Sequence, residues 1–152
     1  AAEIEAEAGL PDRVLVSVGG GGLIAGVAAW FDQRTRVEAL EPVLAPTLHA
    51  AREHGEPVDV AVSGIAADAL GARRIGRIAW QVSQRQVVAS HLIDDDAIRA
   101  AQRRIWLDLR LAVEPAAALG LAALWSGVVR PAAHEKVAVI LCGANLDPAT
   151  LA

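Results

Sequence analysis

The chain alternates between short, continuous apolar runs and longer segments whose apolar residues recur at helical spacing. Continuous apolar runs bounded by turn residues are typical of strands buried in a parallel sheet, and helical spacing predicts helices packed on that sheet. Strands are expected at residues 14–18, 36–40, 86–91 and 136–141. Helices are expected at residues 1–8, 23–34, 46–54, 74–84, 94–110 and 113–127, with a looser segment at 56–72 and a polar loop at 142–147.

This alternation predicts an α/β fold with three layers, in which helices flank a mostly parallel, twisted sheet. We expect one domain over residues 1–152, because the length suits a single domain and no clear linker interrupts the pattern.

The first predicted strand runs directly into four consecutive glycines, Gly19 to Gly22, and a predicted helix follows at once. Glycine has no Cβ, so such a loop can turn sharply and bring backbone N–H groups against a ligand. The helix adds amides without intrahelical partners and the positive end of its dipole. Together these features predict an anion site, most often for phosphate, in preference to a tight turn without a ligand.

Two further polar features also follow predicted strands. Glu41 comes after the second strand, and the segment from Cys142 to Asn145 comes after the last. Ligands of parallel α/β sheets bind at the carboxyl ends of strands, so these residues are candidates for the same site. The acidic triplet Asp94 to Asp96 instead opens a predicted helix, where N-capping is favoured over a catalytic or metal-binding role.

Composition excludes several classes of function. A formal net charge of −4 gives no support to nucleic-acid binding. No apolar run approaches the roughly 20 residues of a membrane span, and the acidic N-terminus argues against a signal peptide. The single cysteine, Cys142, excludes an internal disulfide framework, and we therefore expect a cytoplasmic protein.

The glycine run leaves two phosphate ligands to compare. A nucleoside-triphosphate loop needs Gly-Lys-Ser/Thr after its glycines, and Gly22-Leu23-Ile24 lacks this sequence. A dinucleotide loop fits better, because Gly20, Gly22 and Ala25 match its permissive form and Glu41 lies where a ribose-binding acid is expected. By spacing alone, an NAD-type site stays open.

Four motifs occur along the chain in a fixed order, namely Gly19–Gly26, Leu40-Glu41-Pro42, Glu114–Ala118 and Leu141–Asn145. Together they resemble the tetraglycine loop, Val-Glu-Pro, Glu-Pro-Ser-Gly-Ala and Ser/Cys-Gly-Gly-Asn motifs of the serine/threonine dehydratases. That family consists of fold-type II pyridoxal-phosphate enzymes in the tryptophan-synthase-beta-like superfamily. Residues 63–69 are a weaker match to Thr-Ile-Ala-Asp-Gly. The resemblance spans nearly the whole chain and corresponds to the C-terminal portion of such an enzyme.

The resemblance implies that the cofactor is pyridoxal 5'-phosphate. The backbone amides of Gly19 to Gly22 would hold its phosphate, with Leu23 beside them. Cys142 would lie beside the pyridine nitrogen. A thiol titrates near about 8.5, so it would leave the ring largely neutral, which suits rapid β-elimination. The alternative for Cys142 is an inert buried cysteine.

Two more residues gain roles from the resemblance. Asn145 would brace the loop that carries Cys142. Glu114 would lie near the ring or the substrate, although a Glu before Pro at a helix start also serves as an N-terminal cap. Both readings of Glu114 stay open.

Some family features have no counterpart here. The family's Schiff-base lysine lies in an N-terminal half that is missing from this sequence, together with its substrate-carboxylate loop. The only lysine, Lys136, opens the last predicted strand and is interpreted as a surface charge. Relatives that bind a divalent cation use positions matching Glu41, Ala45 and Thr47. Thr47 replaces the acid, so no metal site is expected.

The resemblance therefore implies a lyase that converts L-serine or L-threonine to a 2-oxo acid and ammonia, with no catalytic residue of its own in this chain. The alternatives are a non-catalytic remnant or partner subunit of such an enzyme, and an NAD-type dinucleotide-binding domain. Expected partners are a small amino acid and either a second copy of the chain, as a homodimer, or the missing N-terminal half. Neither nucleic acid nor a membrane is expected.

Overall fold

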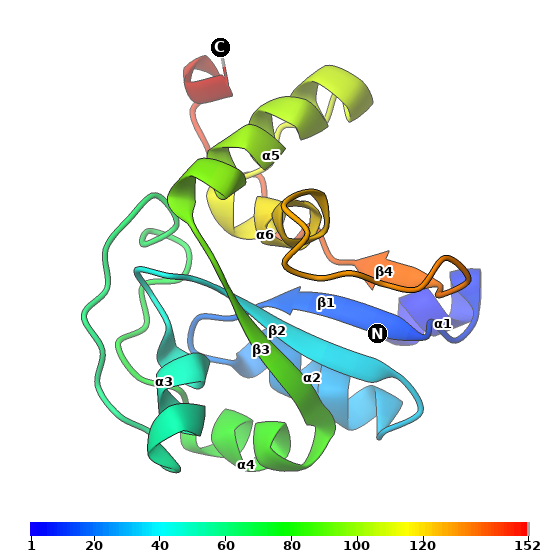
Figure 1. Cartoon of the computed structure of the whole chain (residues 1–152), viewed down its shortest axis with the longest axis vertical. Coiled ribbons are helices and arrows are strands. Elements are labelled where there is room, and N and C mark those ends of the chain that lie inside the picture. The colour runs from blue at the N-terminus through cyan, green and yellow to red at the C-terminus, as the bar shows by residue number, and fades with distance from the viewer. Residues whose placement is uncertain (152) are drawn as a thin grey trace.

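A computed structural model describes residues 1–151 and shows a four-stranded sheet between two layers of helices (Figure 1). The order of the strands is β3-β2-β1-β4, and each neighbouring pair is parallel. The strands are β1 (Arg13–Ser17), β2 (Arg36–Pro42), β3 (Val87–Ile93) and β4 (Val137–Val139). The predicted three-layer α/β fold is confirmed.

Helices from different parts of the chain cover the two faces of the sheet (Figure 1). One layer contains α2 (Gly22–Phe31), α3 (Thr47–His54) and α4 (Arg77–Gln86). The other contains α5 (Asp95–Leu109) and α6 (Pro115–Trp125). The short helix α1 (Ala2–Ala8) adds Ile4 to the first layer, and a 3-10 helix, η1 (Pro148–Leu151), follows the last strand.

Strand β1 shows why the apolar runs are continuous. Val14 and Val16 are buried in the core beneath α2, whereas Leu15 is buried in the core beneath α5 and α6. Successive side chains of a strand point to opposite faces, so a strand covered on both faces must be apolar at every position. The two cores hold the carboxyl ends of β1 and β2 in place.

The helix boundaries differ from the predicted ones where the backbone leaves the right-handed region. Helix α2 ends at Phe31, three residues early, because Asp32 and Gln33 adopt left-handed conformations with φ of 42° and 65°. Helix α4 begins at Arg77 after an extended Gly76, later than the predicted residue 74. Strand β4 is shorter than the predicted 136–141.

The turn from β1 into α2 depends on Gly21. Its φ is +87°, and a Cβ there would lie 2.5 Å from Ile75 Cδ1 and 2.6 Å from Ala79 Cβ. Both the backbone conformation and the packing of α4 therefore require glycine at this position.

We expect Gly21→Ala to lower the free energy of unfolding by more than Gly55→Ala. Gly55 shares a positive φ of +78° but has open space around a Cβ, so that substitution tests the backbone strain alone, about 1–2 kcal/mol. Gly21→Ala adds a clash that costs a further ~1–3 kcal/mol. Urea unfolding of both variants measures the difference, and equal losses would show that the contact with α4 is dispensable.

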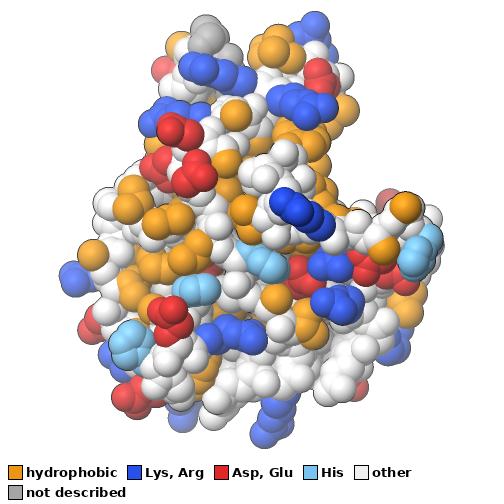
Figure 2. Space-filling model, viewed as in Figure 1, with side chains coloured by type: hydrophobic (Ala, Val, Ile, Leu, Met, Phe, Trp, Pro, Cys, Tyr) orange, Lys and Arg blue, Asp and Glu red, His pale blue; other side chains and the backbone are white. Residues whose placement is uncertain are grey.

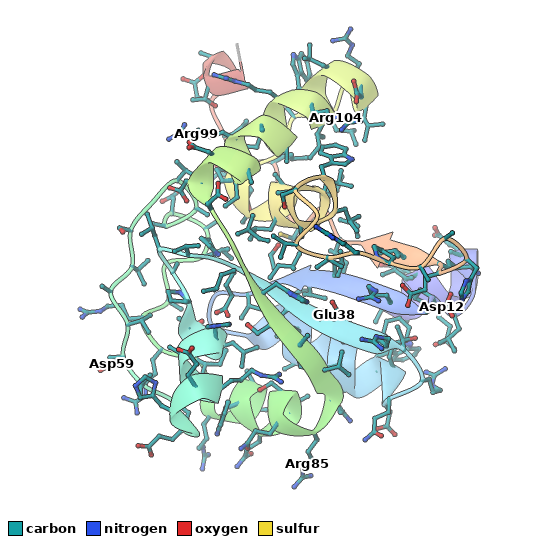
Figure 3. All side chains as sticks on the ribbon, viewed as in Figure 1. Asp12, Glu38, Asp59, Arg85, Arg99 and Arg104 are labelled. Carbon is teal, nitrogen blue, oxygen red and sulfur yellow. The ribbon has the colours of Figure 1, made fainter. Side chains whose placement is uncertain are left out.

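Charged side chains form a network on the face of the sheet near the N-terminal ends of the strands (Figures 2 and 3). Glu38 of β2 is only 1% exposed and accepts hydrogen bonds from Arg13 and from His91 Nε2, the latter at 2.9 Å. A second carboxylate, Glu135, pairs with Arg13 at 2.9 Å. Burial alone would raise the pKa of Glu38, but the bonds from His91 and Arg13 outweigh it and lower that pKa.

We expect Glu38→Gln to destabilise the fold at neutral pH by about 3–5 kcal/mol, because it breaks a buried ion pair. A carboxyl group with a lowered folded pKa stabilises the protein above its unfolded pKa, near about 4.3, and loses this effect as pH falls through the folded pKa. The gap between wild type and variant should therefore narrow in acid. Chemical unfolding from neutral pH downward tests this, and a gap independent of pH would contradict it.

Candidate active site

A cavity of about 260 Å³ lies at the carboxyl end of β1, between the glycine loop and the start of α6. Its lining brings together four segments that are far apart in the sequence. These are Ser17 with Gly19–Leu23, Ala69 with Leu70, Glu114 with Ala116, and Cys142. Seven of the eight residues expected at the site by sequence therefore line one cavity, and Asn145 lies outside its lining.

The N-terminus of α2 faces this cavity without a neutralising group. The N-cap is Gly21, which has no side chain, and the first turn holds no acidic residue. The first intrahelical bond runs from Ala25 N to Gly21 O, so the amides of residues 22–24 precede it. Such amides attract an anion together with the helix dipole. The start of α2 is consequently suited to bind phosphate.

The glycine loop has one packed side and one open side. A Cβ on Gly19 would lie 3.1 Å from the Cα of Leu70, which also lines the cavity. At Gly22 a Cβ would meet nothing within 4 Å. The loop is thus closely packed at Gly19 and has free space at Gly22.

Glu41 serves a different helix. Its carboxyl oxygens accept hydrogen bonds from Leu48 N at 2.7 Å and His49 N at 2.8 Å, in the first turn of α3, and from Ser90 Oγ at 3.1 Å. The hydroxyl of Thr47 lies 3.1 Å from Glu41 Oε1 and 2.7 Å from the Gly19 carbonyl. Burial raises the pKa of Glu41, and the hydrogen bonds oppose this effect. The structural interpretation of Glu41 is confirmed, because both of its carboxyl oxygens accept hydrogen bonds from protein groups.

We expect Glu41→Ala to lower the free energy of unfolding by several kcal/mol, because each buried N–H left without an acceptor costs about 1–3 kcal/mol. Glu53→Ala on the same helix is the matched control, since its side chain is 68% exposed and its loss should cost less than about 0.5 kcal/mol. Thermal unfolding with and without added Mg²⁺ or Ca²⁺ checks the metal expectation. A rise in Tm abolished by Glu41→Ala would reveal a cation site.

Glu114 holds the loop that follows β4. It occupies the N-cap position of α6, with Pro115 next, but its side chain makes no capping bond to α6. Its Oε2 instead accepts the backbone N–H of Asn145 at 3.3 Å, and its own N–H donates to the Gly143 carbonyl at 3.1 Å. A Cβ on Gly143 would meet the carboxylate of Glu114, so a side chain there would displace this carboxylate. Glu114 therefore holds the N-cap position of α6, as one interpretation expects, while its carboxylate bonds to the 143–145 loop.

Cys142 lines the same cavity as the glycine loop. Partial burial, followed by the negative charge of Glu114, raises the pKa of its thiol. The thiol is therefore neutral at physiological pH. It is exposed to solvent in the described chain, so the buried position that the alternative interpretation expected is not found.

Lys136 is far from this cavity in the fold. It immediately precedes β4, at the opposite end of the strand from Cys142, and its Nζ donates to the Ala8 carbonyl at 3.0 Å on the surface. The prediction of a surface charge is confirmed. Since the sequence has no other lysine, the described cavity contains no amine side chain of lysine.

Sequence reasoning missed two contributors. Ser17, the only polar residue among the last four of β1, donates from Oγ to the Ala116 carbonyl at 2.6 Å and so ties the strand to the start of α6. Asp95 is not merely part of a helix start. Asp94 caps α5 by accepting Ala97 N at 2.8 Å, as predicted, but Asp95 accepts Ile65 N at 3.0 Å from the loop before the cavity wall.

Over residues 1–151, no three His, Cys, Asp or Glu side chains come together in a way that could hold a metal ion. In that same range, no helix has the length and apolar character needed to cross a bilayer.

The fold and the cavity define an α/β protein with a glycine-lined cavity at the carboxyl edge of its sheet. The model of the pyridoxal-phosphate dependent enzyme family matches residues 1–143. The chain belongs to this family.

The relatives of the chain include several amino-acid lyases. The chain is 38% identical over 149 residues to a phenylserine dehydratase of Ralstonia pickettii, covering 96% of this chain and 46% of that protein. It is 37% identical to the biosynthetic L-threonine dehydratase of Escherichia coli (strain K12), covering 90% of this chain and 27% of the relative. The chain thus spans between about a quarter and a half of these proteins.

Solved structures share the fold. A threonine deaminase of Solanum lycopersicum (isoform 2, processed form) superposes with a TM-score of 0.87 at 27% identity, covering 99% of this chain and 45% of that one. A maize serine racemase gives a TM-score of 0.86 at 32% identity, covering 99% of this chain and 47% of its own. The four-stranded sheet and its helices therefore have the fold-type II arrangement.

Proposed function

We propose that this chain is the cofactor-holding portion of a serine/threonine ammonia-lyase that uses pyridoxal 5'-phosphate. Its relatives include serine and threonine dehydratases, which supports the reaction class. The observation that carries the proposal is the cavity between the glycine loop and Cys142, into which α2 directs an uncapped N-terminus. When bound, the cofactor supplies an electron sink for cleavage of bonds at the amino-acid Cα.

The residues of the cavity fit such a cofactor chemically. Amides of Gly19 to Gly22, with Leu23 beside them, would hold the phosphate dianion. The thiol of Cys142, kept protonated by its raised pKa, would meet the ring nitrogen as a neutral partner. Glu114 would act on the ring indirectly, because its carboxylate positions the backbone of the 143–145 loop. Asn145 braces this loop through its backbone N–H.

Turnover requires a group that this chain does not place in the cavity. An amine that removes the α-proton is needed, and the only lysine lies at the other edge of the sheet. We infer that the lysine comes from an N-terminal portion that joins this single domain, residues 1–152, or from an associated chain. A homodimer of the joined protein and a cytoplasmic location belong to the same proposal.

We expect the chain to bind pyridoxal 5'-phosphate and to bind pyridoxal, which lacks the phosphate, at least about tenfold more weakly, the equivalent of one charge-assisted hydrogen bond. Gly22→Asp should abolish this binding, because a carboxylate at the first residue of α2 occupies the anion position. The fold should survive, since a Cβ there meets no atom and an acid in the first turn is favourable. Calorimetric titration measures the affinities, and circular dichroism checks the fold.

Gly26→Asp is the matched control. It adds the same charge one turn further along α2, where a Cβ also meets nothing within 4 Å. This variant should bind pyridoxal 5'-phosphate as the wild type does. Equal binding of pyridoxal, or unchanged binding by Gly22→Asp, would refute the phosphate site, and saturable binding of NAD in its place would favour the dinucleotide alternative.

A further inference from the structure

The C-terminal end of α5 projects beyond the rest of the fold (Figure 1). Leu109 continues the inward stripe of Ile98, Gln102 and Ile105 at helical spacing, yet it is 53% exposed whereas the other three are buried. The last turn of α5 therefore extends past the elements that bury its earlier turns. On the outer side of the same turn, Leu107 is 63% exposed.

Large apolar side chains gather around this end of α5. Figure 2 shows hydrophobic side chains there, next to basic and acidic ones. The exposed members are Trp106, Leu107, Leu109 and Leu111, and Trp125 of α6 joins them through Arg104. Exposed apolar patches rimmed by polar groups mark interaction sites, and tryptophan and arginine are enriched in them.

A second cavity, of about 210 Å³, lies between α5 and α6 on the same side of α5 as Leu107. We call it the α5–α6 groove. Alanine lines it from both helices, and Trp125 and Arg104 contribute to its lining, whose alanines are Ala97, Ala100, Ala101 and Ala122. Ala100 and Leu107 are seven residues apart and so lie on one side of α5, two turns from each other. A protruding leucine and a groove lined by small residues thus share one face of the molecule.

Opposite charges flank the protruding leucine. Arg104 and Asp108 lie one turn apart on α5, both more than half exposed, and Arg104 Nε donates to Asp108 Oδ2 at 3.1 Å (Figure 3). The guanidinium carbon of Arg104 lies 4.2 Å from the centroid of the Trp125 ring, which holds the guanidinium group in place. A guanidinium group has five N–H donors, so the bond from Nε leaves donors for a second carboxylate.

We propose that two copies of this chain pair through this face, with their α5 helices antiparallel about a two-fold axis near Trp106. Leu107 of each copy packs into the end of the other copy's α5–α6 groove, beside Trp125. Arg104 of each copy pairs with Asp108 of the other, because antiparallel pairing brings positions on either side of the axis together. The contact is isologous, so every interaction occurs twice.

The pattern of shape and charge favours a second copy over an unrelated partner. An arginine and an aspartate one turn apart on a helix are complementary to the same pair running in the opposite direction. The protruding Leu107 likewise has its receiving groove on its own surface. A face that carries both halves of each contact fits a copy of itself.

This inference deepens the proposed function, which includes a homodimer, by locating the contact. The location rests on α5 and α6, and neither Leu107, Arg104 nor Asp108 lines the cavity at the glycine loop. Gly22→Asp should therefore remain a dimer while it loses pyridoxal 5'-phosphate. Failure of the cofactor site and failure of the interface are thus distinguishable.

The first test is analytical ultracentrifugation of the 152-residue chain, which should be a dimer at micromolar concentrations. Leu107→Asp should raise the dissociation constant of the dimer at least about a hundredfold, since each copy loses a buried leucine. Ile78→Asp on α4 is the matched control, because Ile78 is 71% exposed in the other layer of helices. This control should leave the dimer intact, and circular dichroism should show that both variants fold.

The second test separates contacts between copies from the ion pair within α5. Arg104→Asp and Asp108→Arg each place two like charges on α5, so each variant alone should be monomeric. An equimolar mixture should form a heterodimer, because two acids on one copy then face two arginines on the other. Native mass spectrometry distinguishes the heterodimer from both homodimers by mass.

A monomeric wild-type chain would overturn the proposal. A dimer that Leu107→Asp leaves intact, or that Ile78→Asp also dissociates, would place the contact elsewhere and overturn it too. Absence of the heterodimer from the mixture would overturn the antiparallel pairing of α5.

Discussion

Backbone amides without partners at the starts of helices govern the carboxyl edge of this sheet. A helix leaves its first amides without intrahelical acceptors, and each start must find them elsewhere. Glu41 supplies them to α3, and Asp94 supplies one to α5. Helix α2 receives none from a side chain, because Gly21 is its N-cap. Among these three helices, α2 is left to a ligand, and the positive φ of Gly21 fixes the direction in which it points.

Four glycines make the loop intrinsically flexible, but hydrogen bonds to its carbonyls constrain it in the fold. The hydroxyl of Thr47 lies 2.7 Å from the Gly19 carbonyl, and Gly76 N donates to the Gly20 carbonyl at 3.1 Å. Carbonyls engaged in this way hold the backbone of the loop in one conformation. Preorganised donors need no reordering when an anion binds, so less conformational entropy is lost. The bond to Gly19 also gives Thr47 a structural role, at a position where a cation site would need an acidic side chain.

The sequence predicts the layers, the strands and the glycine loop because these depend on local patterns. Apolar runs identify strands buried on both faces, and a glycine run between a strand and a helix has few other uses. The side chain of Glu114 could not be assigned, because its partner, the N–H of Asn145, lies 31 residues further along the chain. The contact of Asp95 with Ile65 spans 30 residues and was missed for the same reason. Helix ends differed where single residues such as Asp32 adopt left-handed conformations, which composition does not specify.

The groups that line the first cavity are suited to holding a ligand rather than to moving a proton. The cavity offers amides for an anion and a thiol whose raised pKa keeps it neutral, and both are static binding groups at physiological pH. A group that moves a proton must instead change its charge near neutral pH while touching the substrate. Among the residues that line the first cavity, the acidic side chain is Glu114, and its carboxylate is bonded to the 143–145 loop. The described fold therefore brings groups suited to an anion together in one cavity, and its lysine lies at the other edge of the sheet.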